Sequence, residues 1–186
     1  MSTAAGPYRA NIPRFFVFWG LVNFNLWLPI WVIFFQQRGV TLSQLGGLEA
    51  ASGLVMGLAE VATGAVADRW GRKASMMVGA VAFGFAVLGL TTRTLSPLFL
   101  VAYLVWGPAY TFISGADMAF LYDSLKAEGR ADEHPRLAGR YFALEHASGG
   151  GAALLGGWLA TVDMRVCFYA SAAAMLLAAA VAFTFT

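Results

Sequence analysis

The chain has 186 residues, of which 59% are hydrophobic and only 12% are charged, and its formal net charge is +2. An ordinary soluble domain carries about 25% charged residues, so this composition excludes a soluble globule and predicts an all-α protein that has lipid as its solvent. The basic residues are spread over several loops, so no nucleic-acid partner is expected. The single cysteine, Cys167, can close no internal disulfide.

Six apolar runs follow one another along the sequence, and about 20 apolar residues are enough for a helix to cross a bilayer core. We expect residues 1–13 to form a cytoplasmic N-terminal segment and residues 14–186 to form one bundle of six transmembrane helices. The fourth helix is expected to bend near Pro108, because proline removes a backbone hydrogen bond. The six helices are expected at about residues 15–36, 43–67, 74–92, 98–121, 137–161 and 165–186.

The distribution of basic residues sets the expected orientation. Three bases, Arg38, Arg93 and Arg165, lie on one side of this six-helix layout, and nine lie on the other. By the positive-inside rule we expect both termini to be cytoplasmic. We also expect a multi-pass protein of a bacterial-type inner, or plasma, membrane. The nine are Arg9, Arg14, Arg69, Arg72, Lys73, Lys126, Arg130, Arg136 and Arg140.

A charged loop separates the second and third apolar runs, and its sequence reads Gly-Ala-Val-Ala-Asp-Arg-Trp-Gly-Arg-Lys. Its glycine turn with charges on both sides suits a short link between two transmembrane helices at the lipid headgroups. The loop resembles the signature loop between helices 2 and 3 of the major facilitator superfamily. The alternative is a basic loop that only anchors the topology. The residues that carry the resemblance are Gly64, Asp68, Arg69, Gly71, Arg72 and Lys73.

The resemblance implies half of that superfamily's fold, six transmembrane helices arranged as two inverted three-helix repeats. It also implies that Arg72 pairs with Asp123, at the cytoplasmic end of the fourth helix, as a latch that opens during transport. In the family the substrate lies between two six-helix halves, so we expect a second half here: a second copy of this chain, a partner chain, or the rest of a longer carrier. The end at Thr186, without a polar tail, favours the longer carrier.

Small and acidic residues share one face of the second helix. At 100° per residue they fall within a stripe about 100° wide, and a carboxylate facing lipid costs about 2.5 kcal/mol or more at the bilayer centre. The face is therefore expected to meet protein or water, either as a plain packing seam or as a surface that also lines a substrate pathway. The stripe consists of Gly46, Glu49, Gly53, Gly57, Glu60, Gly64 and Asp68.

Further polar and aromatic residues inside the predicted membrane region are candidates for substrate or proton binding. An aromatic wall with one acid favours a cationic or amphipathic substrate, and intramembrane acids favour proton exchange with the cytoplasm. Membrane-interface anchoring and helix-to-helix hydrogen bonds are the alternatives. The candidates, besides Glu49 and Glu60 above, are Trp106, Tyr110 and Asp117 on one face of the fourth helix, Glu145 and His146 on the fifth, and Asn23 and Asn25 on the first.

The family resemblance implies secondary-active transport of a small solute, and the intramembrane acids add proton coupling as a further hypothesis. The alternative is a six-helix membrane protein without transport activity that serves as an assembly or regulatory partner. An enzyme is not expected, because no serine has a matched histidine and aspartate and because His134 and His146 lie on different elements. No metal ion and no cofactor are predicted.

Overall fold

A computed structural model describes residues 6–186, so the expected N-terminal segment lies partly outside the described residues. Within this range the chain forms helices and turns and no strand. Two short 3-10 helices, Pro7–Ala10 and Ala131–Glu133, precede α1 and α7. The α-helices are α1 (Asn11–Val22), α2 (Trp31–Gln37), α3 (Leu42–Trp70), α4 (Arg72–Gly89), α5 (Pro97–Ser114), α6 (Asp117–Ala127), α7 (His134–Ala160) and α8 (Met164–Phe183).

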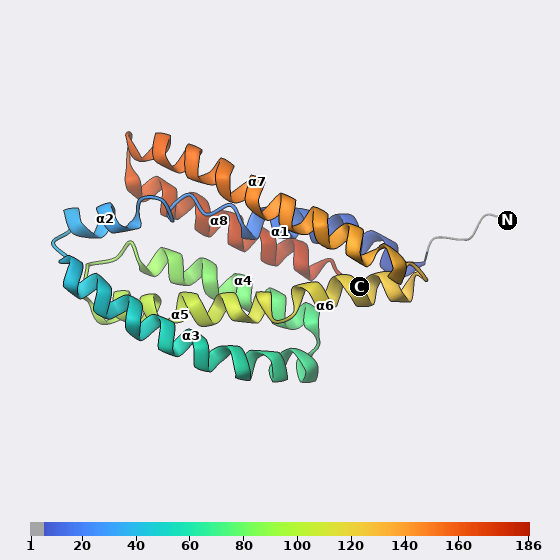
Figure 1. Cartoon of the computed structure of the whole chain (residues 1–186). Coiled ribbons are helices and arrows are strands. Elements are labelled where there is room, and N and C mark those ends of the chain that lie inside the picture. The colour runs from blue at the N-terminus through green and yellow to red at the C-terminus, as the bar shows by residue number, and fades with distance from the viewer. Residues whose placement is uncertain (1–5) are drawn as a thin grey trace.

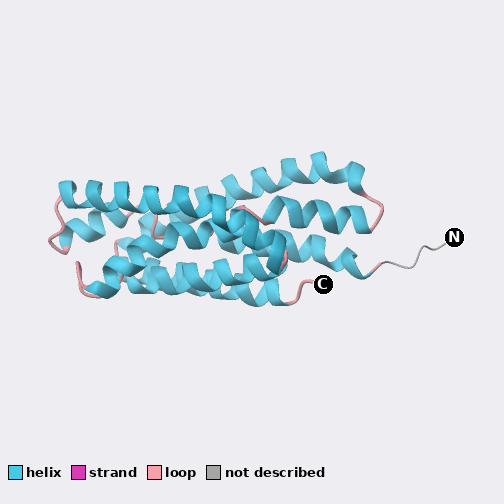
Figure 2. Ribbon diagram, turned by 90° about the horizontal axis from the view of Figure 1, so that it is seen from below, coloured by secondary structure: helices cyan, strands magenta, loops and turns pink. Residues whose placement is uncertain are grey.

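The helices run side by side as one elongated bundle (Figures 1 and 2). The α4 helix lies in the middle and packs on α5 and α8, while α3 covers α5 and α1 covers α8. The described N-terminal residues, the turn between α3 and α4, the α6 to α7 connection and the C-terminus all lie at one end of the bundle (Figure 1). Nine basic residues therefore gather at this end, as the sequence predicts.

The first predicted helix, residues 15–36, is wrong as a continuous element, because residues 23–30 separate α1 from α2. Asn23 Nδ2 donates to the carbonyl of Trp19 at 2.9 Å, and Asn25 Nδ2 donates to that of Val22 at 2.7 Å. Such side-chain bonds compete with the helical pattern, and Pro29 has no N–H to continue it.

A neighbouring helix supports this interruption. The backbone N–H of Leu26 donates to Ser171 Oγ of α8 at 2.9 Å, so a freed donor is satisfied inside the bundle. Gly156 of α7 lies so close to the Leu26 carbonyl that a Cβ would collide with it. The break is therefore a packed feature, held between α7 and α8.

The fourth predicted helix, residues 98–121, is also interrupted. The α5 helix continues through Pro108, where the bend was expected, and ends at Ser114. Gly115 and Ala116 then separate it from α6, with Ala116 at φ −122° and ψ −25°. The first and the fourth predicted spans are thus both built from two helical pieces.

Four helical stretches are long and apolar enough to cross a membrane among the described residues. The α1 helix is too short alone, and α7 is long but not among the four. The protein is therefore a multi-pass, all-α membrane protein. The four stretches are Leu42–Trp70, Arg72–Gly89, Pro97–Ala127 and Met164–Phe183.

Candidate functional site at the charged end and on the face of α3

A single glycine makes the turn between α3 and α4. Gly71 has φ 89° and ψ 144°, a conformation that glycine adopts without the steric cost of a Cβ. It is the single residue between the end of α3 at Trp70 and the start of α4 at Arg72. Asp68 and Arg69 therefore lie in the last turn of α3, and Arg72 lies at the start of α4.

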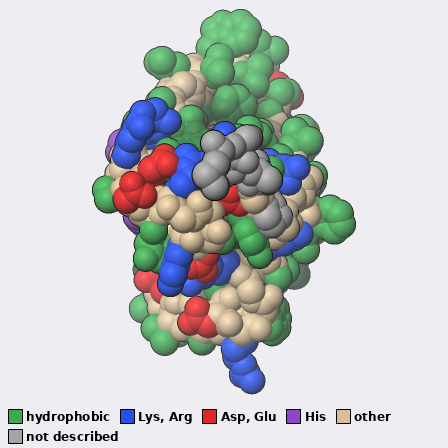
Figure 3. Space-filling view, turned by 90° about the vertical axis from the view of Figure 1, so that its right-hand side faces the viewer, with side chains coloured by type: hydrophobic (Ala, Val, Ile, Leu, Met, Phe, Trp, Pro, Cys, Tyr) green, Lys and Arg blue, Asp and Glu red, His purple; other side chains and the backbone are tan. Residues whose placement is uncertain are grey.

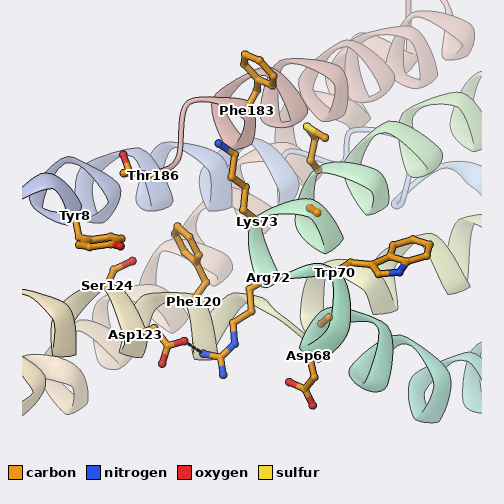
Figure 4. A pocket seen from close by; sticks show the side chains of 14 residues that line it. Tyr8, Asp68, Trp70, Arg72, Lys73, Phe120, Asp123, Ser124, Phe183 and Thr186 are labelled. Atoms are coloured by element: carbon orange, nitrogen blue, oxygen red, sulfur yellow. Dashed lines mark hydrogen bonds and ion pairs between the residues drawn. The ribbon is translucent and has the colours of Figure 1, made fainter.

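Arg72 ties this turn to α6. Its Nη1 donates to Asp123 Oδ2 and to the carbonyl of Ala119, each at 2.5 Å (Figure 4). The side chains of Arg72 and Asp123 are 31% and 57% exposed. The pair that the sequence predicts is thus formed, and a backbone carbonyl shares the same guanidinium.

The other charged residues of the turn act separately. Lys73 extends in another direction from Arg72, donates to the carbonyl of Phe185 and lies 5.7 Å from the centre of the Phe183 ring (Figure 4). Asp68 and Arg69 are exposed, and neither forms an ion pair within the described part of the chain. Asp68 therefore does not join the contact between Arg72 and Asp123.

A hollow of about 700 Å³ opens beside this turn, where α3, α4, α6 and the end of α8 meet. Figure 3 views this end of the molecule and shows Lys, Arg, Asp and Glu side chains gathered on it, with hydrophobic side chains around the rim. Charged side chains at an end and apolar ones around it fit the surface of a bilayer. The hollow is lined by Asp68, Trp70, Arg72, Lys73, Asp123 and Phe183, among others.

The stripe of small and acidic residues on α3 lies open in this half. Glu60 is exposed, and no atom lies within 4 Å of a Cβ built on Gly46, Gly53, Gly57 or Gly64. Glu49 is also exposed, and it accepts a hydrogen bond of 2.5 Å from the Tyr103 hydroxyl. The stripe therefore lies beside the packing interface between α3 and α5, and α5 does not cover it.

Asp117 lies beyond the break at Gly115, at the start of α6, whereas Trp106 and Tyr110 lie on α5. Asp117 is 2% exposed and accepts a hydrogen bond of 2.6 Å from the Tyr141 hydroxyl of α7. Its other oxygen accepts from the N–H of Met118 at 2.5 Å. This carboxyl group joins α6 to α7 in the interior.

A family model described as Major Facilitator Superfamily matches residues 14–186. The chain belongs to the major facilitator superfamily. Its members are transporters and not enzymes, so the expected class of protein is confirmed. Neither the curated proteins nor the solved structures contain a match to it.

The remaining candidate residues of this superfamily member have different surroundings. Some bond to their own backbone segment, some are half-buried between helices, and one is exposed. Asn23 and Asn25 bond to the backbone of their own segment and stabilise the break. Tyr110 is half-buried against Phe83, whose ring centre lies 6.4 Å away. Glu145 is half-buried and His146 is exposed, both on α7.

Sequence reasoning missed two tyrosines that hold the acids. Tyr103 donates to Glu49, and Tyr141 donates to Asp117. Tyr141 and Glu145 lie one helical turn apart, on one face of α7, and this spacing could have indicated Tyr141. Nothing in the sequence near Tyr103 indicates its partner on α3.

Proposed function

We propose that this chain is one half of a secondary-active carrier that moves a small solute, and that its open α3 face meets a second half. The observation that carries the proposal is the exposed acidic stripe of α3 in a member of the major facilitator superfamily. A carboxylate in contact with lipid costs about 2.5 kcal/mol or more at the bilayer centre. A second copy, a partner chain or a further part of the same carrier would remove that cost.

The proposed topology has six spans in two inverted sets of three, with both termini cytoplasmic in an inner, plasma-type membrane. The first set is α1 with α2, then α3 and α4, and the second is α5 with α6, then α7 and α8. Each set begins with a span made of two helical pieces, which supports a repeat. The gathering of nine bases at one end supports the orientation.

In this proposal the contact between Arg72 and Asp123 is the latch of the transport cycle. It joins α4 to α6, which belong to different sets, so a movement that separates these two helices breaks it. Gly64, Asp68, Arg69, Gly71 and Lys73 shape the turn that carries the arginine. A plain exposed ion pair contributes only about 0 to 1 kcal/mol, so a latch needs partial burial or further bonds. The Arg72 side chain is 31% exposed and also donates to the Ala119 carbonyl, which supports this role.

Proton coupling is the further part of the proposal, with Glu60, Asp117 and Glu145 as the groups that exchange protons. Reconstitution in liposomes that contain a pH-sensitive dye tests it. We expect a solute-dependent proton flux that Glu60→Gln and Asp68→Asn reduce. Absence of any solute flux from an assembled form would contradict transport and leave a role as an assembly or regulatory partner.

A further inference from the structure

A small cavity of about 160 Å³ lies apart from the charged turn, between the break in the first span, α3 and α5. Three tryptophans, one tyrosine and one glutamate surround it, together with one leucine. We call these residues the aromatic cage. They are Trp27, Leu28, Trp31, Glu49, Tyr103 and Trp106.

The rings of the cage are held in place by the core behind them. The Trp27 and Trp106 rings meet edge to face, with centres 5.8 Å apart and planes at 81°. Trp27 packs in turn on Phe168, at 5.6 Å, and Trp106 packs on Phe83, at 6.2 Å. Two walls of the cavity are therefore rigid, and the interruption of the first span is what brings Trp27 to α5.

Glu49 gives the cavity its charge. The Tyr103 hydroxyl donates to Oε1 of this carboxylate at 2.5 Å, which fixes its position, while Oε2 receives no hydrogen bond among the described residues. No lysine or arginine lies in the part of the wall that the structure describes. Because Glu49 and Leu28 are exposed, the cavity opens onto the face that α3 presents.

We propose that the aromatic cage binds the ammonium head of a small organic cation, with quaternary ammonium as the best-fitting class. A ring face attracts a cation that lies within about 6 Å of its centre. The cage offers a carboxylate as its counter-charge, and a quaternary ammonium needs no hydrogen-bond acceptor beyond that charge. Drug-sized ligands need about 300 to 1,000 Å³, so this cavity takes a head group and not a whole drug.

This inference rests on the proposed function, because the cage would then be the part of the transport pathway that selects the solute. It adds a substrate class, small organic cations, to the proposal of a solute carrier. The alternative is that these aromatic residues only pack against the break and bind no ligand. The two interpretations differ in whether the positive charge of a ligand strengthens its binding.

Equilibrium binding to the full chain in lipid nanodiscs tests the cage directly. The probes are choline and 3,3-dimethylbutan-1-ol, which has the same shape with a neutral carbon in place of the charged nitrogen. We expect choline to bind at least about tenfold more tightly. Equal affinity of the two probes, or no binding of choline, would overturn the proposal.

Matched variants locate the site. Glu49→Gln and Trp106→Leu should each weaken choline binding about tenfold. Asp132→Asn, at an exposed acid of the charged end, and Trp158→Leu on α7 should leave it unchanged. Trp106→Phe keeps a ring and should retain part of the affinity, which separates lost binding from lost folding. A loss with Asp132→Asn equal to that with Glu49→Gln would contradict the assignment.

The same experiments separate this inference from the proposed function. Choline binding without solute flux from the assembled protein would support the cage and contradict transport. Solute flux without any preference for choline over its neutral counterpart would support transport and contradict the cage.

Discussion

Arg72 and Asp123 meet at 2.5 Å although 51 residues separate them in the chain, and the same guanidinium nitrogen also donates to the carbonyl of Ala119. The arginine is fixed by the one-residue turn at Gly71, and the aspartate by the last turns of α6. The contact joins the two proposed sets of helices at the charged end of the bundle.

Loss of the ion pair should affect transport more than stability. We expect Asp123→Asn to change the free energy of unfolding by less than about 1 kcal/mol, because both side chains are partly exposed, and to lower solute flux in liposomes. Thermal unfolding and flux measured on one preparation check this. Asp132→Asn, at an exposed acid of the same end, is the control, and identical flux in the two variants would contradict the latch.

The hydrogen bond between Tyr141 and Asp117 should stabilise the interior. Tyr141→Phe removes the donor but keeps the ring stacked on Trp19, whose centre lies 4.2 Å away. We expect a loss of about 1 to 3 kcal/mol, because a buried carboxyl group loses a partner. Tyr169→Phe, at an exposed tyrosine of α8, is the control. A loss that persists unchanged in an Asp117→Ala background, where the acceptor is absent, would show that the bond is not its cause.

Close packing of α4 on α5 depends on Gly79. A Cβ at this position would lie 2.7 Å from the carbonyl oxygen of Ala109 and 2.8 Å from Cγ1 of Ile113. Because the carbonyl belongs to the backbone, α5 has to move, and Gly79→Ala should cost about 1 to 3 kcal/mol. Gly139→Ala on α7, where nothing lies within 4 Å, should cost nothing. Equal thermal stability of the two variants would disprove this packing.

The short helix Ala131–Glu133 carries an ion pair with a defined pH dependence. Arg130 donates to both carboxylate oxygens of Glu133, at 2.5 and 2.9 Å, and holds the pKa of that carboxyl below its usual 4.5. A depressed pKa stabilises the folded state above pH 4.5, and this contribution is lost as the pH falls through the lowered value. Carboxyl NMR of the protein should show the lowered pKa, and Arg130→Gln should move it back toward 4.5. An unchanged pKa in that variant would rule out Arg130 as the cause.

Sequence patterns predict the parts of the fold that depend on local chemistry. The run at residues 43–67 became α3, with Thr41 as its N-cap, because hydropathy and capping are local properties. The pairing of Arg72 with Asp123 came from the family resemblance and is present in the structure.

The interruptions and the carboxyl partners could not be predicted in the same way. Residues 23–30 are mostly apolar, so hydropathy shows one continuous run and no break. The break depends on contacts with Ser171 and Gly156, which lie on helices distant in the sequence. Which acid Tyr103 and Tyr141 each bond depends on how the helices pack, and no spacing within one helix reveals that pairing. The rotation arithmetic that joined Trp106 to Asp117 assumes an unbroken helix, and Gly115 and Ala116 interrupt that helix.

The central claim is that the acidic stripe of α3 faces protein or water and not lipid. Spin labels on single cysteines, in a chain whose Cys167 is replaced, measure accessibility to oxygen, which dissolves in lipid, and to a polar nickel complex, which does not. A label at Gly57 should show restricted motion or access of the nickel complex, in contrast to a label at Phe85, which is exposed on α4. Oxygen accessibility at Gly57 equal to that at Phe85 in the assembled protein, with no nickel access, would contradict the account.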